Sequence, residues 1–213
     1  MMKLYGYWRS SAAYRVRIAL NLKCLEVEEE FIHLQKNDQT SDDYLAVNPQ
    51  GLVPTLIDGD VRLSQSLAIL EYLDERHPEP ALLPTDIPGR ARVRQLAQVV
   101  ACDIHPIDNL KVLNFLTGEL GVSAEGRLTW YRHWVNQGLD GLEGLVAGHP
   151  GTGRFCHGDQ PSLADLCLVP QLYNARRFEV DLSPYPTLLG IDAACQALDA
   201  FAKAAPEVQP DAN

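Results

Sequence analysis

The chain has 213 residues, of which 46% are hydrophobic and 22% are charged, and its formal net charge at pH 7 is −10. This length allows one large domain or two small ones with buried cores. The acidic balance argues against nucleic-acid and anionic-membrane partners, because both reward basic surfaces. No apolar run approaches the roughly 20 residues that span a bilayer, and no signal-type leader is apparent. We therefore expect a cytoplasmic protein with neither kind of partner.

The five cysteines are scattered along the chain and odd in number. Neither they nor the six histidines show the spacing of a disulfide framework or a zinc site. We therefore expect small buried thiols and no bound metal.

The N-terminal third alternates short strand-like and helix-like segments. The pattern predicts a strand at 3–8, a helix at 11–23, a strand at 27–34, a hairpin around 55–63 and a helix from 66 to a proline-rich stretch at 77–80. The hairpin is indicated by Asp58-Gly59 between two apolar runs, since glycine tolerates positive φ. Three successive glutamates, 28–30, are expected at a solvated edge. This order of elements is typical of the thioredoxin fold.

From residue 90 onward, every periodic segment predicts a helix. Helices are expected at 90–117, 124–147, 163–177 and 187–203. Ser162 and Asp165 have the spacing of a helix N-terminal capping box, and the tail from Pro206 is expected to fray. The predicted fold is thus an α/β thioredoxin-like domain (1–82), a linker (83–89) and an all-α domain (90–213).

Two segments of the first domain combine a strand or helix end with binding chemistry. Val53-Pro54 precedes a strand, and in the thioredoxin fold this position holds a cis-proline whose neighbouring backbone binds a ligand like an added strand. Gln65-Ser66 opens a helix, whose N–H groups and partial positive charge suit a carboxylate. Ser66 is also an ordinary N-cap residue, and both roles are compatible.

A third segment, Arg9-Ser10-Ser11, lies between the first strand and the first helix. A hydroxyl at a helix N-terminus can donate a hydrogen bond to a thiolate and so lower a thiol pKa from its usual value of about 8.5. Capping alone explains one serine here, so this segment by itself is weak evidence for function.

Several co-linear blocks resemble the zeta class of glutathione transferases, and together they cover nearly the whole chain. The blocks are SSAAYRVRIAL (10–20), NPQGLVPTL (48–56), QSLAILEYL (65–73), HPIDNL (105–110) and NARRFEVDL (174–182). The resemblance implies the cytosolic glutathione transferase fold, glutathione as the cofactor and a homodimer. It also implies a glutathione-dependent cis–trans isomerase for a small dianionic dioxo-alkenoate: the thiolate adds to the alkene, the resulting single bond rotates, and the thiolate leaves.

The resemblance assigns roles to residues at matching positions. Ser10 and Ser11 would stabilise the thiolate, with Arg9 as a third catalytic residue. The glutathione-binding residues would be Ser10, Ser11, Val53, Pro54, Gln65, Ser66, Asp103, His105 and Asn109. Arg9, Arg177 and Arg176 would hold substrate carboxylates, since a guanidinium binds them bidentately; Arg176 is alternatively a surface residue and His105 a packing residue. Ala12 replaces the family cysteine, so the reacting sulfur must come from glutathione.

Two isomerases of this class differ mainly in substrate, which is maleylacetoacetate from tyrosine breakdown or maleylpyruvate from gentisate breakdown. The maleylpyruvate type is expected to carry an arginine after the asparagine of the His-Pro motif. Here Asn109 is followed by Leu110-Lys111, which favours maleylacetoacetate. A general conjugating transferase and a non-catalytic binding module are further alternatives. The paired arginines argue against the first and the retained serines against the second.

Overall fold

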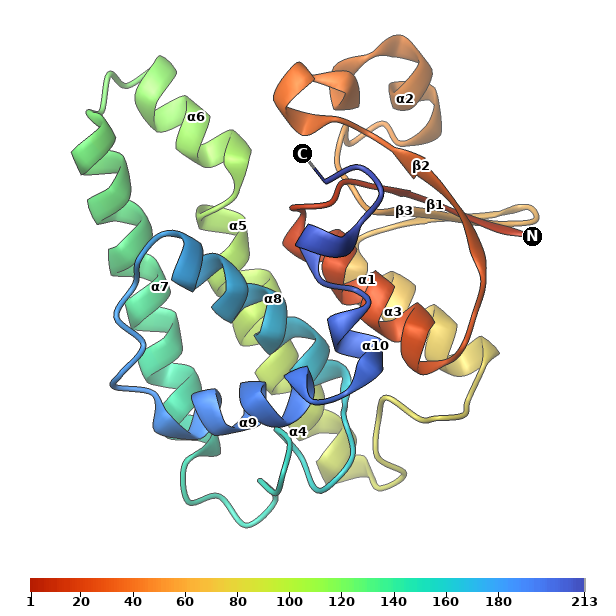
Figure 1. Ribbon diagram of the computed structural model, residues 1–213, viewed down its shortest axis with the longest axis vertical. Helices are drawn as coiled ribbons and strands as arrows, with labels where there is room; N and C mark the ends of the chain where they lie inside the picture. The colour runs from red at the N-terminus through yellow and green to blue at the C-terminus, as the bar shows by residue number, and fades with distance from the viewer. Residues whose placement is uncertain (213) are drawn as a thin grey trace. The chain divides into compact units, whose positions relative to one another are not determined.

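The computed structural model describes residues 1–212 as two compact units (Figure 1). The first unit contains residues 1–82 together with 196–212, and the second contains Leu83–Cys195. Within the described part of the chain, no helix is both long and apolar enough to cross a membrane.

The first unit is built on a four-stranded mixed sheet. Its strands are β1 (Met2–Gly6), β2 (Val27–Phe31), β3 (Thr55–Asp58) and β4 (Val61–Ser64), in the order β2-β1-β3-β4. β1 runs parallel to β2 and antiparallel to β3, and β3 pairs antiparallel with β4. The turn joining β3 to β4 consists of Gly59 and Asp60, and Gly59 has a φ of 58°. The predicted hairpin and the thioredoxin-like order are therefore confirmed.

Two helices of this unit, α1 (Ser11–Leu22) and α3 (Ser66–Arg76), pack against each other, and the short α2 (Asp42–Val47) precedes β3 (Figure 1). Leu4 of the central strand and Leu56 of β3 are buried with the apolar residues of both helices. This packing brings the start of α1, the start of α3 and the segment before β3 into one unit.

Lys23 follows the last residue of α1, and its side chain is completely buried. Its ammonium group donates to Asp74 Oδ1 at 2.9 Å, to the carbonyl of His77 at 2.7 Å and to the carbonyl of Pro80 at 2.7 Å. Asp74 also accepts from the backbone N–H of Leu82 at 2.8 Å. The C-terminal ends of α1 and α3 are thereby tied to the chain that leaves the unit.

The second unit is helical. Its elements are α4 (Ile87–Gln98), a π-helical segment η3 (Val99–Ile104), α5 (His105–Ile107), α6 (Leu110–Gly118), α7 (Ala124–Val146), α8 (Leu163–Arg177) and α9 (Pro186–Gln196). Helix α8 is buried along most of its length and packs on α4. The predicted capping box is present, because Asp165 accepts from the N–H of Ser162 at 2.7 Å and from its hydroxyl at 2.8 Å.

The helix expected at residues 90–117 differs from the structure at its start and at its end. The first helix begins at Ile87, where Asp86 caps it, so the connection between the units is shorter than the expected 83–89. It does not continue to residue 117, because Asp108 and Asn109 leave helical geometry. Two of the five thiols, Cys24 and Cys102, are exposed rather than buried.

The tail was expected to fray, and this expectation is wrong for residues 206–212. The last elements, α10 (Asp199–Ala202) and η4 (Pro206–Val208), belong to the first unit and not to the helical one. Arg17 of α1 donates to the carbonyl of Ala204 at 3.1 Å, and Asn21 donates to that of Ala200 at 3.0 Å. Donors on α1 thus hold the tail, which sequence periodicity does not reveal.

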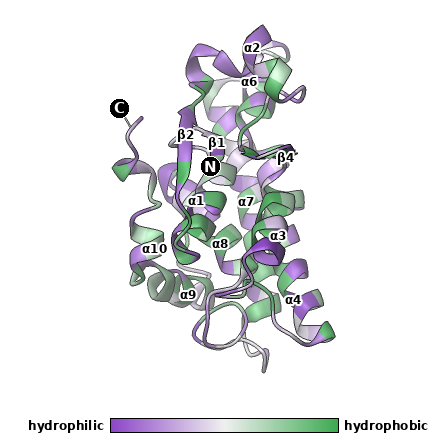
Figure 2. Cartoon of the chain, turned by 90° about the vertical axis from the view of Figure 1, so that its right-hand side faces the viewer, coloured by the Kyte–Doolittle hydropathy of each residue, from purple (hydrophilic) through white to green (hydrophobic). Residues whose placement is uncertain are grey.

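The glutamate run of β2 is also only partly at a solvated edge. Glu28 and Glu30 are exposed and pair with Lys3, whereas Glu29 is half-buried. Burial raises the pKa of Glu29, and the nearby charge of Arg17 lowers it. The hydrophilic stretch of β2 in Figure 2 therefore includes one glutamate that is half-buried.

Candidate active site

Ser10 is the N-cap of α1. Its hydroxyl oxygen accepts from the backbone N–H of Ala13 at 3.2 Å, and its own N–H donates to the carbonyl of Tyr7 at 2.9 Å. No acceptor within residues 1–212 takes the hydroxyl proton of Ser10. The side chain is half-buried, so this proton is available to a ligand at the positive end of the helix.

Ser11 differs from Ser10 in burial. It is the first residue of α1 and only 4% exposed. Of the two hydroxyls, that of Ser10 is therefore the more accessible to a sulfur atom.

Arg9 precedes these serines and lies over the ring of Trp8, at 4.8 Å from the ring centroid. Its only hydrogen bond within residues 1–212 goes from Nη2 to the Tyr7 hydroxyl at 3.4 Å, and its buried Nε has no partner there. No carboxylate of the described chain forms an ion pair with Arg9. A guanidinium held in this way can bind a substrate carboxylate.

The bond between Val53 and Pro54 is cis, as predicted. Thr55 begins β3 directly after it and pairs with Tyr5. No hydrogen bond within residues 1–212 uses the backbone N–H or carbonyl of Val53. The backbone before β3 is therefore free to bind an extended ligand as a further strand.

The N-terminus of α3 is built differently from the starts of the other long helices. Side chains cap α1, α4, α6 and α7, whereas Gln65 at the start of α3 provides no such cap. Gln65 also has a φ of 72°, which is strained for a residue with a side chain. Strain of this kind often marks functional sites, and free N–H groups at a helix start suit an anion.

Two residues that sequence reasoning missed support this helix start. Arg15 is 1% exposed, and its Nη1 donates to the hydroxyl of Ser66 at 3.0 Å. The Gln50 side-chain oxygen accepts from Ser64 and from Gln65, each at 3.1 Å. A signal for Arg15 was present in the sequence, since a charged residue inside an apolar helix must have a buried partner.

Asn109, in the second unit, serves its own helix. Its side-chain oxygen accepts from the N–H of Val112 at 3.2 Å, and its amide donates to the carbonyl of Pro106 at 2.9 Å. His105 begins α5 and is half-buried, and Asp103 lies exposed in η3. The π-helical form of η3 is notable, because π-helical turns occur often at functional sites.

The two arginines at the end of α8 lie in different surroundings. Arg176 forms an ion pair with Asp192 of α9 at 2.6 Å, so its charge already has a partner. Arg177 is exposed, and its guanidinium lies over the ring of Phe178 at 5.0 Å from the centroid. The alternative of a surface role thus suits Arg176, and Arg177 remains a predicted carboxylate ligand.

Asp108 is a further group that sequence reasoning missed. It is 7% exposed, and within residues 1–212 neither carboxylate oxygen has a hydrogen-bond partner. Burial raises its pKa to about 7. An acidic residue between Ile107 and the capping Asn109 gave no sign of burial, because its environment comes from the packing of other helices.

Comparison with known proteins agrees with this geometry. Residues 1–75 match the family model described as glutathione S-transferase, N-terminal domain. The chain is 54% identical to a probable maleylacetoacetate isomerase of Vibrio cholerae, over 98% of this chain and 97% of that one. It is 50% identical to maleylpyruvate isomerase, a bacterial zeta-class glutathione transferase, whose holo structure superposes with a TM-score of 0.97 over 99% of this chain and 100% of that one. The chain belongs to the zeta class of glutathione transferases.

The structure of a third relative contains bound ligands. The structure of maleylacetoacetate isomerase from Methylobacterium extorquens AM1, with bound malonate and glutathione, is 49% identical and has a TM-score of 0.96 over 99% of each chain. Glutathione is the cofactor of these isomerases.

The first unit fits glutathione on its own observations. A tripeptide with a free γ-glutamyl carboxylate needs an extended backbone to pair with, a site for the carboxylate and a donor for the sulfur. Val53 offers the first, the uncapped start of α3 offers the second, and the Ser10 hydroxyl offers the third. The residue after Ser11 is Ala12, so no protein thiol stands beside these serines.

Proposed function

We propose that this chain catalyses the glutathione-dependent cis–trans isomerisation of maleylacetoacetate to fumarylacetoacetate. The observation that carries the proposal is the Ser10 hydroxyl, which caps α1 through its oxygen and keeps its proton for a ligand. Beside it stands Arg9, whose guanidinium has no acidic partner in the described chain. Addition of a thiolate to an anionic enone requires a hydrogen-bond donor for the thiolate and a cation that can bind the substrate carboxylate.

When bound, glutathione supplies the sulfur nucleophile that adds reversibly to the conjugated double bond. Ser10 donates its hydroxyl proton toward that sulfur and so favours the thiolate at neutral pH. The backbone of Val53 and the start of α3 hold the tripeptide, so that the sulfur is positioned before the substrate arrives. Arg9 binds a substrate carboxylate and lowers the energy of negative charge that develops during addition.

The preference for maleylacetoacetate is supported by the sequence after Asn109, where Leu110-Lys111 stands in place of the expected arginine. Arg177 is proposed as the second carboxylate ligand. The 50% identity to maleylpyruvate isomerase makes maleylpyruvate the second candidate substrate. A transferase that conjugates apolar electrophiles has no need of two arginines that bind substrate carboxylates.

The biological setting is part of the proposal. The reaction belongs to tyrosine catabolism, and we place it in the cytoplasm and in a homodimer. Class membership supports the homodimer, and the composition and the absence of a spanning helix within residues 1–212 are compatible with the cytoplasm. Light scattering of the purified protein tests the dimer directly.

The deciding experiment is an isomerisation assay of the purified protein with maleylacetoacetate and with maleylpyruvate, each with and without glutathione. We expect turnover only when glutathione is present, and faster turnover with maleylacetoacetate. Preference for maleylpyruvate would select the alternative substrate. Failure to isomerise both, in a protein that binds glutathione, would refute the isomerase proposal.

A further inference from the structure

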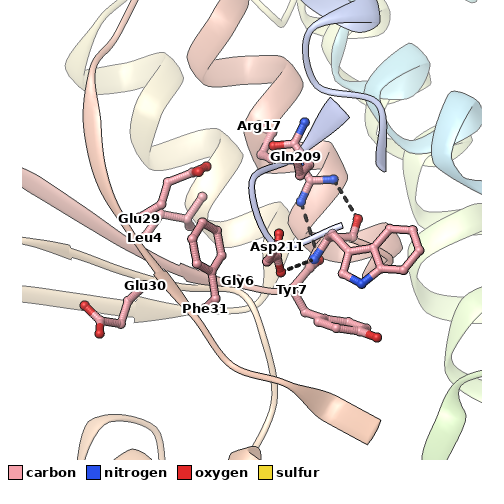
Figure 3. Close-up of a pocket in the computed structure, with 10 residues that line it drawn as sticks. Leu4, Gly6, Tyr7, Arg17, Glu29, Glu30, Phe31, Gln209 and Asp211 are labelled. Atoms are coloured by element: carbon pink, nitrogen blue, oxygen red, sulfur yellow. Dashed lines mark hydrogen bonds between the residues drawn. The ribbon is translucent and has the colours of Figure 1, made fainter. Parts of the chain in front are cut away.

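Both backbone polar groups of Trp8 form hydrogen bonds with charged side chains. Its N–H donates to Asp211 Oδ2 at 2.9 Å, and its carbonyl accepts from Arg17 Nη2 at 2.9 Å. Asp211 lies 203 residues away in the chain, whereas Arg17 lies on α1. Figure 3 shows both side chains converging on this stretch of backbone. A loop residue fixed at its N–H and its carbonyl has little freedom to reorient.

The partners of this peptide are themselves anchored. Arg17 is 6% exposed, and it also donates from Nε to the carbonyl of Ala204 at 3.1 Å and from Nη1 to that of Tyr7 at 3.5 Å. The tail that carries Asp211 is therefore bound to α1 by the same guanidinium that binds the Trp8 carbonyl. One side chain joins the helix, the loop and the tail.

The charges at this point are unequal. Asp211 and the half-buried Glu29 both act on Arg17 electrostatically, so that two carboxylates face one cation. Burial lowers the pKa of Arg17 to about 10, which leaves it charged at neutral pH. These residues line a small recess with Leu4, Tyr7 and Gln209 (Figure 3). None of the predicted glutathione-binding residues lines this recess, so it lies outside the set of groups that would touch the tripeptide.

Trp8 lies two residues before Ser10, whose hydroxyl is proposed to stabilise the thiolate. The N–H of Ser10 donates to the carbonyl of Tyr7 at 2.9 Å, and this carbonyl is also an acceptor of Arg17. Arg9 lies between Trp8 and Ser10. The position of the hydroxyl and of the substrate-binding guanidinium is therefore set by a turn whose first half is fixed by Arg17 and Asp211.

We propose that Asp211, acting with Arg17, is a positioning residue that holds the Trp8–Ser10 loop in the geometry needed to stabilise the glutathione thiolate. This inference rests on the proposed function. It assigns the C-terminal tail a part in catalysis, although the tail contributes no group to the reaction itself.

The first test measures the hold on the loop without any ligand. Amide hydrogen exchange at Trp8 is compared in the apo forms of the wild type, Asp211→Ala, Asp211→Asn and Asp199→Ala. Asp199 is a matched control, because it is an exposed tail carboxylate that pairs only with Lys203. We expect exchange about tenfold or more faster in Asp211→Ala, and near wild type in the other two, since Asn keeps an acceptor. Unchanged exchange in Asp211→Ala, or equal loss in Asp211→Asn, would overturn the proposal.

The second test measures the effect on the sulfur. Ultraviolet absorbance of bound glutathione, titrated with pH, reports the thiol pKa in the same variants. With Asp211→Ala we expect about tenfold less thiolate at neutral pH and a kcat about tenfold lower, with a KM for glutathione close to wild type. Faster Trp8 exchange with an unchanged thiol pKa would show a purely structural tail. If the wild type isomerises no maleyl substrate, the proposed function fails, yet both of these readouts still decide whether Asp211 positions the loop.

Discussion

The two units of this protein differ in how they use several of the groups that were predicted to bind ligands. The first unit leaves several groups unused within the described chain: the Ser10 hydroxyl proton, the backbone of Val53 and the start of α3. The second unit uses two of its predicted ligands for its own structure, since Asn109 caps α6 and Arg176 pairs with Asp192. Unused donors cost stability, so a folded protein keeps them where a ligand will use them. This difference supports the proposal that residues of the first unit bind glutathione.

The largest effect is expected at Ser10. Ser10→Ala removes the hydroxyl that would donate a hydrogen bond to the thiolate. We expect kcat to fall at least about 100-fold, the range seen when one such donor is removed. It also removes a helix cap, which costs about 1 kcal/mol of stability. Ser10→Asp separates the two roles, because aspartate caps a helix but repels a thiolate. We expect Ser10→Asp to melt near the wild-type temperature while its turnover is as low as that of Ser10→Ala. An active Ser10→Asp would show that capping alone matters.

The second largest effect concerns stability in the second unit. Burial raises the pKa of Asp108 to about 7 in the folded protein, above its ordinary value of 3.8. Between these values the folded chain holds a proton that the unfolded chain has released, so stability falls as pH rises through this window. Asp108→Asn cannot ionise and should be more stable than the wild type by about 4 kcal/mol at pH 8, with little difference near pH 4. Denaturant unfolding across this range measures the difference.

The exposed neighbour Asp103 provides the control for this prediction. Asp103→Asn makes the same chemical change at an exposed position, and it should not reproduce the gain in stability expected of Asp108→Asn at pH 8. If Asp108→Asn instead lowered stability at every pH, the carboxylate would have a partner that compensates its burial.

A smaller effect is expected at the start of α3. Ser66→Ala removes the hydroxyl that accepts from Nη1 of the buried Arg15 and should raise the KM for glutathione about tenfold, because the first turn loses this support. Ser64→Ala is the matched control, since the hydroxyl of the half-buried Ser64 donates to Gln50 and not to the start of α3. Initial-rate kinetics and calorimetric titration with glutathione measure both variants. An unchanged KM in Ser66→Ala would mean that the backbone alone binds the carboxylate.

The smallest effect tests the second unit directly. Arg176→Ala leaves the buried carboxylate of Asp192 without its ion pair and should lower stability by about 1 kcal/mol. We expect its turnover and its substrate KM to stay within about twofold of wild type, whereas Arg177→Ala should mainly raise the substrate KM. Thermal melts and steady-state kinetics compare the two. A large rise in the substrate KM of Arg176→Ala would show that Arg176 binds substrate and does not serve only the structure of the second unit.

Local sequence signals predicted much of the fold. The hairpin at Gly59 and the capping box at Ser162 follow from chemistry that lies within a few residues, whereas the cis bond at Pro54 was predicted from its place in the thioredoxin-like order of elements. The helix over 163–177 has the observed bounds for the same reason. Family resemblance, rather than spacing, supplied the roles of Arg9 and Ser10.

The missed features all depend on contacts between distant segments. The contact of Asp211 with Trp8 spans most of the chain, and the buried Asp108 lies near Tyr131 of α7. The burial of Arg15 and Arg17 on α1 was not predicted, and acceptors of their guanidinium groups lie in α3 and in the tail. Periodicity records which face of a helix is buried and not what covers it.

The environment of Lys23 has a practical consequence. Its three ammonium protons are all committed to acceptors, and its side chain has no access to solvent. An amine-reactive reagent can reach this nitrogen only when the ends of α1 and α3 separate. Of the five lysines in the chain, Lys23 should therefore be labelled last. Its rate of labelling, followed by mass spectrometry, then measures how often the first unit opens locally.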